Sequence, residues 1–192
     1  ILSSRRYPYV KIPTRSNVNL INFFNTYPQS CINDDPTTKW QFYANTPLST
    51  IVKATLYPAL ASAINGKSEA DAANILLNLV QTSFVYKEDE EVWGYDRPFF
   101  ADETVYYPYS DCEDRAILFS RLVRDLMKLK VVLVYYPGHL ATAVNYHENI
   151  AGDYLQINGE KYLICDPTYI NAPIGLTMPG MDNHIARVVT LE

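Results

Sequence analysis

The segment SDCEDRAILFSRLVRDLMKLKVVLVYYPGHLATAV, residues 110–144, decides the fold, because it contains one long helix followed directly by a β-hairpin. Ser110 and Glu113 have the spacing of a capping box, and the acidic residues of this first turn suit the positive end of a helix. Apolar side chains then recur at helical spacing, which predicts a helix from Ser110 to about Lys128. They are Ile117, Leu118, Leu122 and Leu126.

Short β-prone segments follow this helix to the end of the chain. They cover residues 131–136, 140–146, 154–157, 161–165 and 185–191, and Asn158-Gly159 is a signal for a type I′ hairpin turn. The segments predict an antiparallel sheet of four or five strands. Helices precede the strands along the chain, so the predicted fold class is α+β.

The first half of the chain is predicted to be helical. Residues 16–27 carry apolar side chains on a helical period and predict a first helix. Thr46 and Pro47 are read as the cap and first residue of a second helix, which extends to about residue 65 and is kinked at Pro58. Ser68 opens a third helix. Three stretches are predicted to lack helices. Residues 29–45 are read as a loop with a buried edge, 87–91 (KEDEE) as a solvated turn rather than a calcium site, and 92–109 as a long aromatic loop.

Length and charge exclude several classes of protein. The 192 residues predict one domain, with residues 1–98 as its helical N-terminal part and 99–192 as its core. The net charge of −5 disfavours a nucleic-acid partner, and we expect no membrane-spanning segment because no apolar run is long enough. The chain begins at Ile1, so we expect a processed form or a piece of a longer protein with a flanking domain missing.

Cys112 is the candidate nucleophile. It falls in the first turn of the predicted helix, where unpaired N–H groups and the helix dipole are expected to lower the pKa of a thiol. The alternative is a small buried core residue, but Cys112 is flanked by Asp111, Glu113 and Asp114 rather than by apolar side chains. Of the other cysteines, Cys165 is read as a core residue. The odd total of three indicates at least one free thiol.

His139 and Asp166 complete a constellation with Cys112. His139 lies 27 residues after Cys112 at the entrance of a predicted strand, and Asp166 lies 27 residues further on, at the end of another. An imidazole there can act as a base, and a carboxylate can orient it. Taken singly, His139 is more often a structural histidine and Asp166, before a proline, a turn former. The conjunction of the three in this order is the signal.

The sequence resembles the transglutaminase-like cysteine peptidase and transamidase superfamily, within the papain-like fold, and looks like a bacterial member. The resemblance is carried by residues 106–126, 135–144 and 159–179 and covers roughly 99–179. It implies that Cys112 is the nucleophile, His139 the general base and acid, and Asp166 the orienting carboxylate. It also implies a transglutaminase-like core over residues 99–192, no cofactor, and a peptide or protein substrate. The location is left open, with the bacterial periplasm or cell surface as the expectation after processing.

An oxyanion donor is needed besides the backbone N–H of Cys112. We predict Tyr107 for this role, with Trp93 as the other candidate donor and Tyr109 beside them in a substrate groove. The predicted function is acyl transfer at an amide or peptide bond through a thioester, with water as the favoured acceptor. Three alternatives stay open: a transamidase, a binding module that holds a peptide or glycan in an aromatic groove, and a zinc site at Cys112, His139 and Asp166. The groove residues of the binding module would be Trp93, Tyr95, Phe99, Phe100, Tyr106, Tyr107 and Tyr109.

Overall fold

The computed structural model describes residues 1–28 and 35–192, and it has an α+β architecture. The helices are α1 (Val18–Asn25), α2 (Pro36–Asn45), α3 (Thr50–Ile64), α4 (Glu69–Ser83), α5 (Asp89–Val92), α6 (Ala101–Tyr106) and α7 (Cys112–Met127). The strands are β1 (Leu2–Ser3), β2 (Lys11–Ile12), β3 (Val85–Tyr86), β4 (Tyr109–Ser110), β5 (Lys130–Tyr136), β6 (His139–Asn145), β7 (Tyr154–Ile157), β8 (Glu160–Cys165) and β9 (Arg187–Thr190).

The main sheet has five strands in the order β7-β8-β6-β5-β9, and every neighbouring pair is antiparallel. This confirms the predicted antiparallel sheet. Asn158 and Gly159 connect β7 to β8 with φ values of 50° and 84°, as a type I′ turn requires. Two smaller pairs lie outside this sheet: β1 runs antiparallel to β2, and β3 runs parallel to β4.

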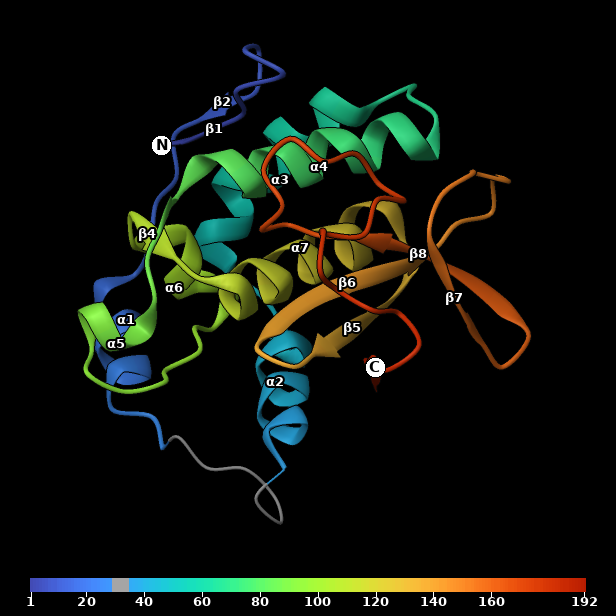
Figure 1. The fold of residues 1–192 in the computed structure, drawn as a ribbon. Coiled ribbons are helices and arrows are strands. Elements are labelled where there is room, and N and C mark those ends of the chain that lie inside the picture. Colours follow the sequence, from blue (N-terminus) through green and yellow to red (C-terminus); the bar gives the residue numbers. More distant parts are fainter. Residues whose placement is uncertain (29–34) are drawn as a thin grey trace.

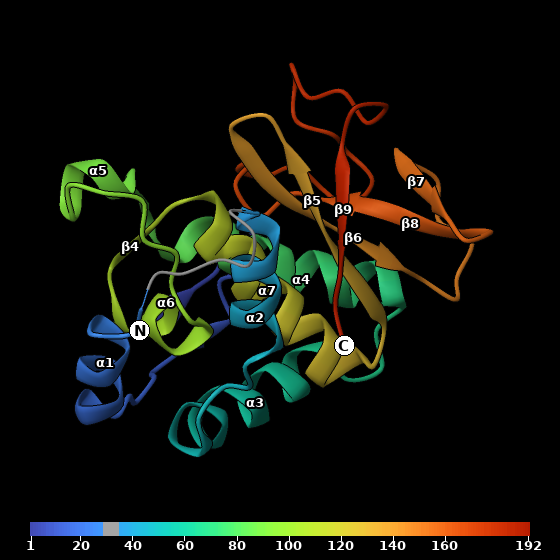
Figure 2. The same ribbon diagram turned by 90° about the horizontal axis from the view of Figure 1, so that it is seen from below.

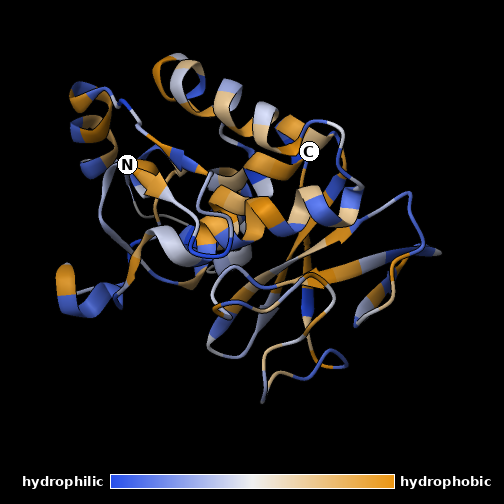
Figure 3. Ribbon diagram, turned by 90° about the horizontal axis from the view of Figure 1, so that it is seen from above, coloured by the Kyte–Doolittle hydropathy of each residue, from blue (hydrophilic) through white to orange (hydrophobic). Residues whose placement is uncertain are grey.

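Helix α7 occupies the centre of the molecule. It packs on β5 and β6 on one side and on α2, α4 and α6 on its others (Figure 1). Figure 2 shows the helices gathered on one side of the molecule and the five-stranded sheet on the other. In Figure 3 the central helices and strands carry much of the hydrophobic colouring, and the connecting loops are largely hydrophilic. Because α7 is buried between these layers, the position of its first residue is held by the core itself.

The predicted loop over residues 29–45 is wrong for residues 36–45, which form α2. The Asp35 side chain accepts the N–H of Thr37, and Pro36 sits in the first turn, where its missing N–H costs nothing. Burial of Trp40, Tyr43 and Ala44 along one face then stabilises the helix. Residues 29–34, including Cys31, lie outside the described residues.

Two other boundaries differ from the prediction. α3 is capped by Ser49, whose side chain accepts the N–H of Val52, whereas Thr46 ends α2. The stretch 87–109 contains α5 and α6, and Asp89 of the supposedly solvated turn is only 8% exposed. α6 begins after Phe100, whose N–H donates to the carboxylate of Glu103 three residues on. By contrast, Ser68 caps α4 as predicted. Within the described ranges, no helix combines the length and apolar character needed to cross a bilayer.

Candidate active site

Cys112 is the first residue of α7, as the sequence predicts, but the capping pair is a different one. Asp111 is the N-cap, and its side chain accepts the N–H of Asp114 while the Asp114 carboxylate accepts the N–H of Asp111. The predicted pair of Ser110 and Glu113 is wrong: Ser110 accepts a hydrogen bond from Arg115 Nε instead. Glu113 is therefore available to contact the sulfur.

The Cys112 thiol lies in an acidic, largely buried environment. Its Sγ donates to Glu113 Oε2 across 3.1 Å and accepts from the backbone N–H of Leu140. Burial raises the pKa of Cys112 well above its ordinary value, and the charges of Glu113 and Asp111 raise it further. The predicted lowering of the Cys112 pKa is therefore wrong. A helix N-terminus contributes about 0.3–1 kcal/mol, under one pKa unit, whereas burial shifts a pKa by up to about 3–5 units.

His139 and Asp166 form a buried pair. His139 begins β6 directly after the turn at Gly138, and Asp166 follows the last residue of β8, the neighbouring strand. His139 Nε2 lies 2.8 Å from Asp166 Oδ2, and the two side chains are 7% and 1% exposed. Because Nε2 is engaged by the carboxylate, Nδ1 is the ring nitrogen left for another partner.

The carboxylate of Asp166 has a second role. Its Oδ1 accepts the N–H groups of Thr168 and Tyr169 at 2.8 and 3.1 Å, which makes it a turn former as well as the partner of His139. The buried Gln81 side chain holds the same loop, since its Nε2 donates to the carbonyl oxygens of Asp166, Tyr169 and Ala172. The orientation of the carboxylate is thereby determined on both sides.

Cys112 and His139 open on one pocket of about 320 Å³. Its acidic side is formed by Glu113 and Asp96, and its aromatic side by Trp40 and Tyr135, whose rings lie 5.0 Å apart. The other lining residues are Pro36, Gly138 and Leu140. Trp40 is 8% exposed, and its Nε1 has no hydrogen-bond partner among the residues that the structure describes. A buried, unpaired donor in a pocket wall is costly unless a ligand pairs with it.

The predicted groove residues lie elsewhere. Tyr107, Trp93 and Tyr109 form an aromatic cluster with Phe99, and none of the three is among the residues lining the Cys112 pocket. Tyr107 Oη donates to Asn25 Oδ1 across 3.0 Å. Phe99 and Phe100 are buried in the core rather than in an open groove. Trp40 is a pocket residue that the predicted loop over residues 29–45 does not identify, although Asp35-Pro36 is the same helix-start signal as Thr46-Pro47.

Three carboxylates meet beside the pocket. Oxygens of Asp89, Asp96 and Glu113 lie within 4.8 Å of one another, a spacing that a hard divalent cation could bridge. Burial and the charges of its two neighbours raise the pKa of Asp89 to about 7. Within the described part of the chain this is the one such convergent group. Cys112, His139 and Asp166, the zinc ligands considered above, do not form another.

The chain matches no protein-family model and no curated protein. Among solved structures it is similar to Legionella pneumophila LapG at 17% sequence identity, over 81% of this chain and 74% of that chain, with a TM-score of 0.35. A likeness at this score establishes neither a shared fold nor a shared activity.

Proposed function

We propose that this chain is a cysteine-dependent enzyme that cleaves amide or peptide bonds, with Cys112 as nucleophile, His139 as base and acid, and Asp166 as the residue that orients the imidazole. One observation carries the proposal. Cys112 and His139 line the same pocket, while Asp166 binds His139 at the ring nitrogen Nε2. A sulfur, an imidazole and a buried carboxylate in this arrangement are the parts that nucleophilic catalysis by a thiol requires.

The reaction begins from a neutral thiol, because burial, Glu113 and Asp111 raise the pKa of Cys112. Imidazole of His139 takes the thiol proton as Sγ attacks the substrate carbonyl carbon and forms the S–C bond. The C–N bond then breaks, His139 returns the proton to the leaving amine, and a thioester remains on Cys112. Water, activated by His139, hydrolyses the thioester and regenerates the thiol. Asp166 stabilises the imidazolium that forms in both half-reactions.

Two donors can stabilise the oxyanion of the tetrahedral intermediate. The first is the backbone N–H of Cys112, which lies in the first turn of α7, where N–H groups have no partner within the helix. The second is the indole N–H of Trp40, a residue that lines the pocket; its Nε1 is buried and lacks a partner in the described structure. Trp40 suits this role better than the three aromatic residues predicted from the sequence, because Trp93, Tyr107 and Tyr109 do not line the pocket.

Water is the acceptor we favour. A turn of two residues, Pro137 and Gly138, joins β5 to β6 beside the pocket, so this hairpin supplies no long flap to exclude water. A transamidase needs to keep water away from its thioester. The peptide- or glycan-binding alternative loses its main support, because the aromatic residues that would form its groove include the buried Phe99 and Phe100.

The proposal is tested by trapping the acyl-enzyme. The full chain is mixed with p-nitrophenyl acetate, quenched in acid and weighed as an intact protein, and the modified residue is located by peptide mapping. We expect one acyl group on Cys112 and none on the Cys112→Ala variant. A parallel assay with a library of peptide p-nitroanilides tests amide cleavage. Acylation that persists in Cys112→Ala, or no acylation and no amide cleavage at all, would contradict the proposal. Adding glycine methyl ester distinguishes an amine acceptor from water.

A further inference from the structure

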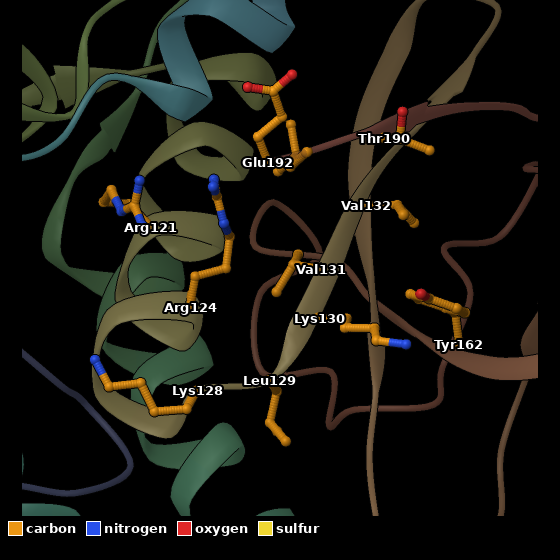
Figure 4. A pocket seen from close by; sticks show the side chains of 11 residues that line it. Arg121, Arg124, Lys128, Leu129, Lys130, Val131, Val132, Tyr162, Thr190 and Glu192 are labelled. Atoms are coloured by element: carbon orange, nitrogen blue, oxygen red, sulfur yellow. The ribbon is translucent and has the colours of Figure 1, made fainter.

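A second cavity, of about 460 Å³, lies at the opposite end of α7 from Cys112 (Figure 4). The helix rises 1.5 Å per residue, so its first and last residues, Cys112 and Met127, are about 22 Å apart along its axis. Arg121, Arg124 and Lys128 extend from this end of the helix, and Lys130 and Val132 lie on β5 across the cavity. The cavity is therefore separate from the candidate active site.

Four cations line this cavity in a chain whose net charge is −5, and the nearby carboxylates do not balance them. Lys130 is paired with Glu160 at 2.6 Å. Arg121 is paired with Asp125 at 2.5 Å, but Asp125 also lies 3.8 Å from Lys53 and so serves two cations. Part of the positive charge on this side of the cavity is thus left without a counter-ion.

Arg124 and Lys128 contribute the uncompensated charge. Among the residues that the structure describes, Arg124 donates only to neutral oxygens, the carbonyl of Ala44 and Oδ1 of Asn45, at 3.0 and 3.1 Å. Burial and the charge of Arg121 lower the pKa of Arg124 to about 10, which still leaves it protonated at neutral pH. No ion pair of Lys128 is found in the described part of the chain.

Two further features are unfavourable for the empty protein. Arg121 Nε is buried and has no hydrogen-bond partner among the described residues. Lys128 ends α7 with φ 59°, in the left-handed region where a glycine is the ordinary residue. A lysine at that position strains the backbone, and strained residues concentrate at sites that bind ligands.

The helix dipole alone does not account for these cations. It places roughly half a negative charge at the end of α7, and Glu192 adds one acidic side chain to the cavity wall. The positive charge at this end of α7 is larger than that negative charge. It comes from Arg124, Lys128 and the part of the Arg121 charge that Asp125 does not neutralise. The two neighbouring guanidinium groups of Arg121 and Arg124 (Figure 4) also suit an anion with acceptors on several sides, which is a phosphate rather than a planar carboxylate.

We propose that this cavity binds the phosphate group of a small molecule, with Arg121 and Arg124 beside the phosphate oxygens and Lys128 adding positive charge at the rim. The remaining wall is largely apolar and offers a surface for an organic remainder. It consists of Leu129, Val131, Val132, Tyr162 and Leu191. The cavity volume lies in the range usual for sites of small ligands.

The test is calorimetric titration of the full chain at low ionic strength with three probes: phenyl phosphate, inorganic phosphate and benzoate. We expect both phosphate probes to bind and benzoate to bind at least tenfold more weakly. Arg124→Gln should weaken phosphate binding about tenfold, or about 1.4 kcal/mol, and Lys128→Gly, which removes a more distant charge, should weaken it less. Lys128→Gly also relieves the left-handed strain, so its melting temperature should not fall, and weaker binding cannot be attributed to unfolding.

Lys11→Gln is the matched control, because Lys11 is an exposed cation of β2 that does not line the cavity. It should bind the probes as the parent chain does, and so should Cys112→Ala. Tighter binding of phenyl phosphate identifies a phosphate monoester as the ligand class, and equal binding identifies free phosphate. The proposal is overturned by the absence of saturable phosphate binding, by benzoate binding as tightly as phenyl phosphate, or by an equal loss in Lys11→Gln or Cys112→Ala.

Discussion

Replacing Trp40 by Phe removes the indole N–H, exchanges the bicyclic ring for a smaller one and keeps an aromatic ring against Tyr135. If that N–H donates to the oxyanion only as the tetrahedral intermediate forms, kcat should fall and KM should change little. The loss of one oxyanion donor costs about 10²–10³ in kcat, or about 2.7–4 kcal/mol. We therefore expect at least a hundredfold loss of turnover in Trp40→Phe.

The stability of this variant should change far less than its activity. The indole N–H of Trp40 is buried without a partner in the described structure, so its removal returns about 1–3 kcal/mol of desolvation cost. The smaller ring loses packing worth about 1–2 kcal/mol. The two contributions nearly cancel, and the melting temperature should stay within a few degrees of the parent value. A structural role alone would instead lower stability and activity together.

The assay is the release of p-nitrophenol from p-nitrophenyl acetate, corrected for the rate of Cys112→Ala. Trp93→Phe is the matched control, because Trp93 Nε1 is also buried without a partner in the described residues but does not line the pocket. It should keep the parent turnover. An unchanged kcat in Trp40→Phe, or an equal loss in both variants, would refute the assignment of Trp40 as a donor.

Three further predictions follow from the same site. Asp166→Asn should lower turnover about 10⁴-fold while circular dichroism shows an intact fold, because an amide oxygen can still accept the turn N–H groups but cannot stabilise an imidazolium; retained turnover would exclude Asp166 from the mechanism. Glu113→Gln should speed the alkylation of Cys112 by iodoacetamide at pH 7, since Glu113 raises the pKa of the thiol. Glu90→Gln, which changes an exposed carboxylate, should not change the rate. Equal rates in both variants would contradict an effect of Glu113 on the thiol pKa. Burial raises the pKa of Asp89 from 3.8 to about 7, so the folded state binds this proton more tightly than the unfolded state, and the free energy of unfolding should fall by up to about 4 kcal/mol between pH 4 and pH 7. In Asp89→Asn, urea titrations should show a weaker pH dependence of the free energy of unfolding. An unaltered pH dependence would exclude Asp89 as its source.

Several elements could be predicted from the sequence because short-range patterns determine them. α7 carries its apolar residues at helical spacing, Ser68 lies directly before α4, and Asn158-Gly159 suits only a few tight turns. α2 was missed because its apolar residues are interleaved with polar ones, and contacts with α7 and β9 supply much of its stability. Local propensity cannot register contacts with elements far along the chain.

The sequence by itself determined the α+β class, the antiparallel strands and the identity of the residues around which a thiol mechanism can be proposed. Only the tertiary structure decided what surrounds them. It gave the capping role to Asp111 and Asp114, which left Glu113 against the sulfur, and it buried the thiol. Burial, followed by the charge of Glu113, raises the pKa of Cys112. It also brought Trp40 to the pocket wall. Burial and charge at a site depend on distances between segments remote in sequence, and those distances exist only after the chain has folded.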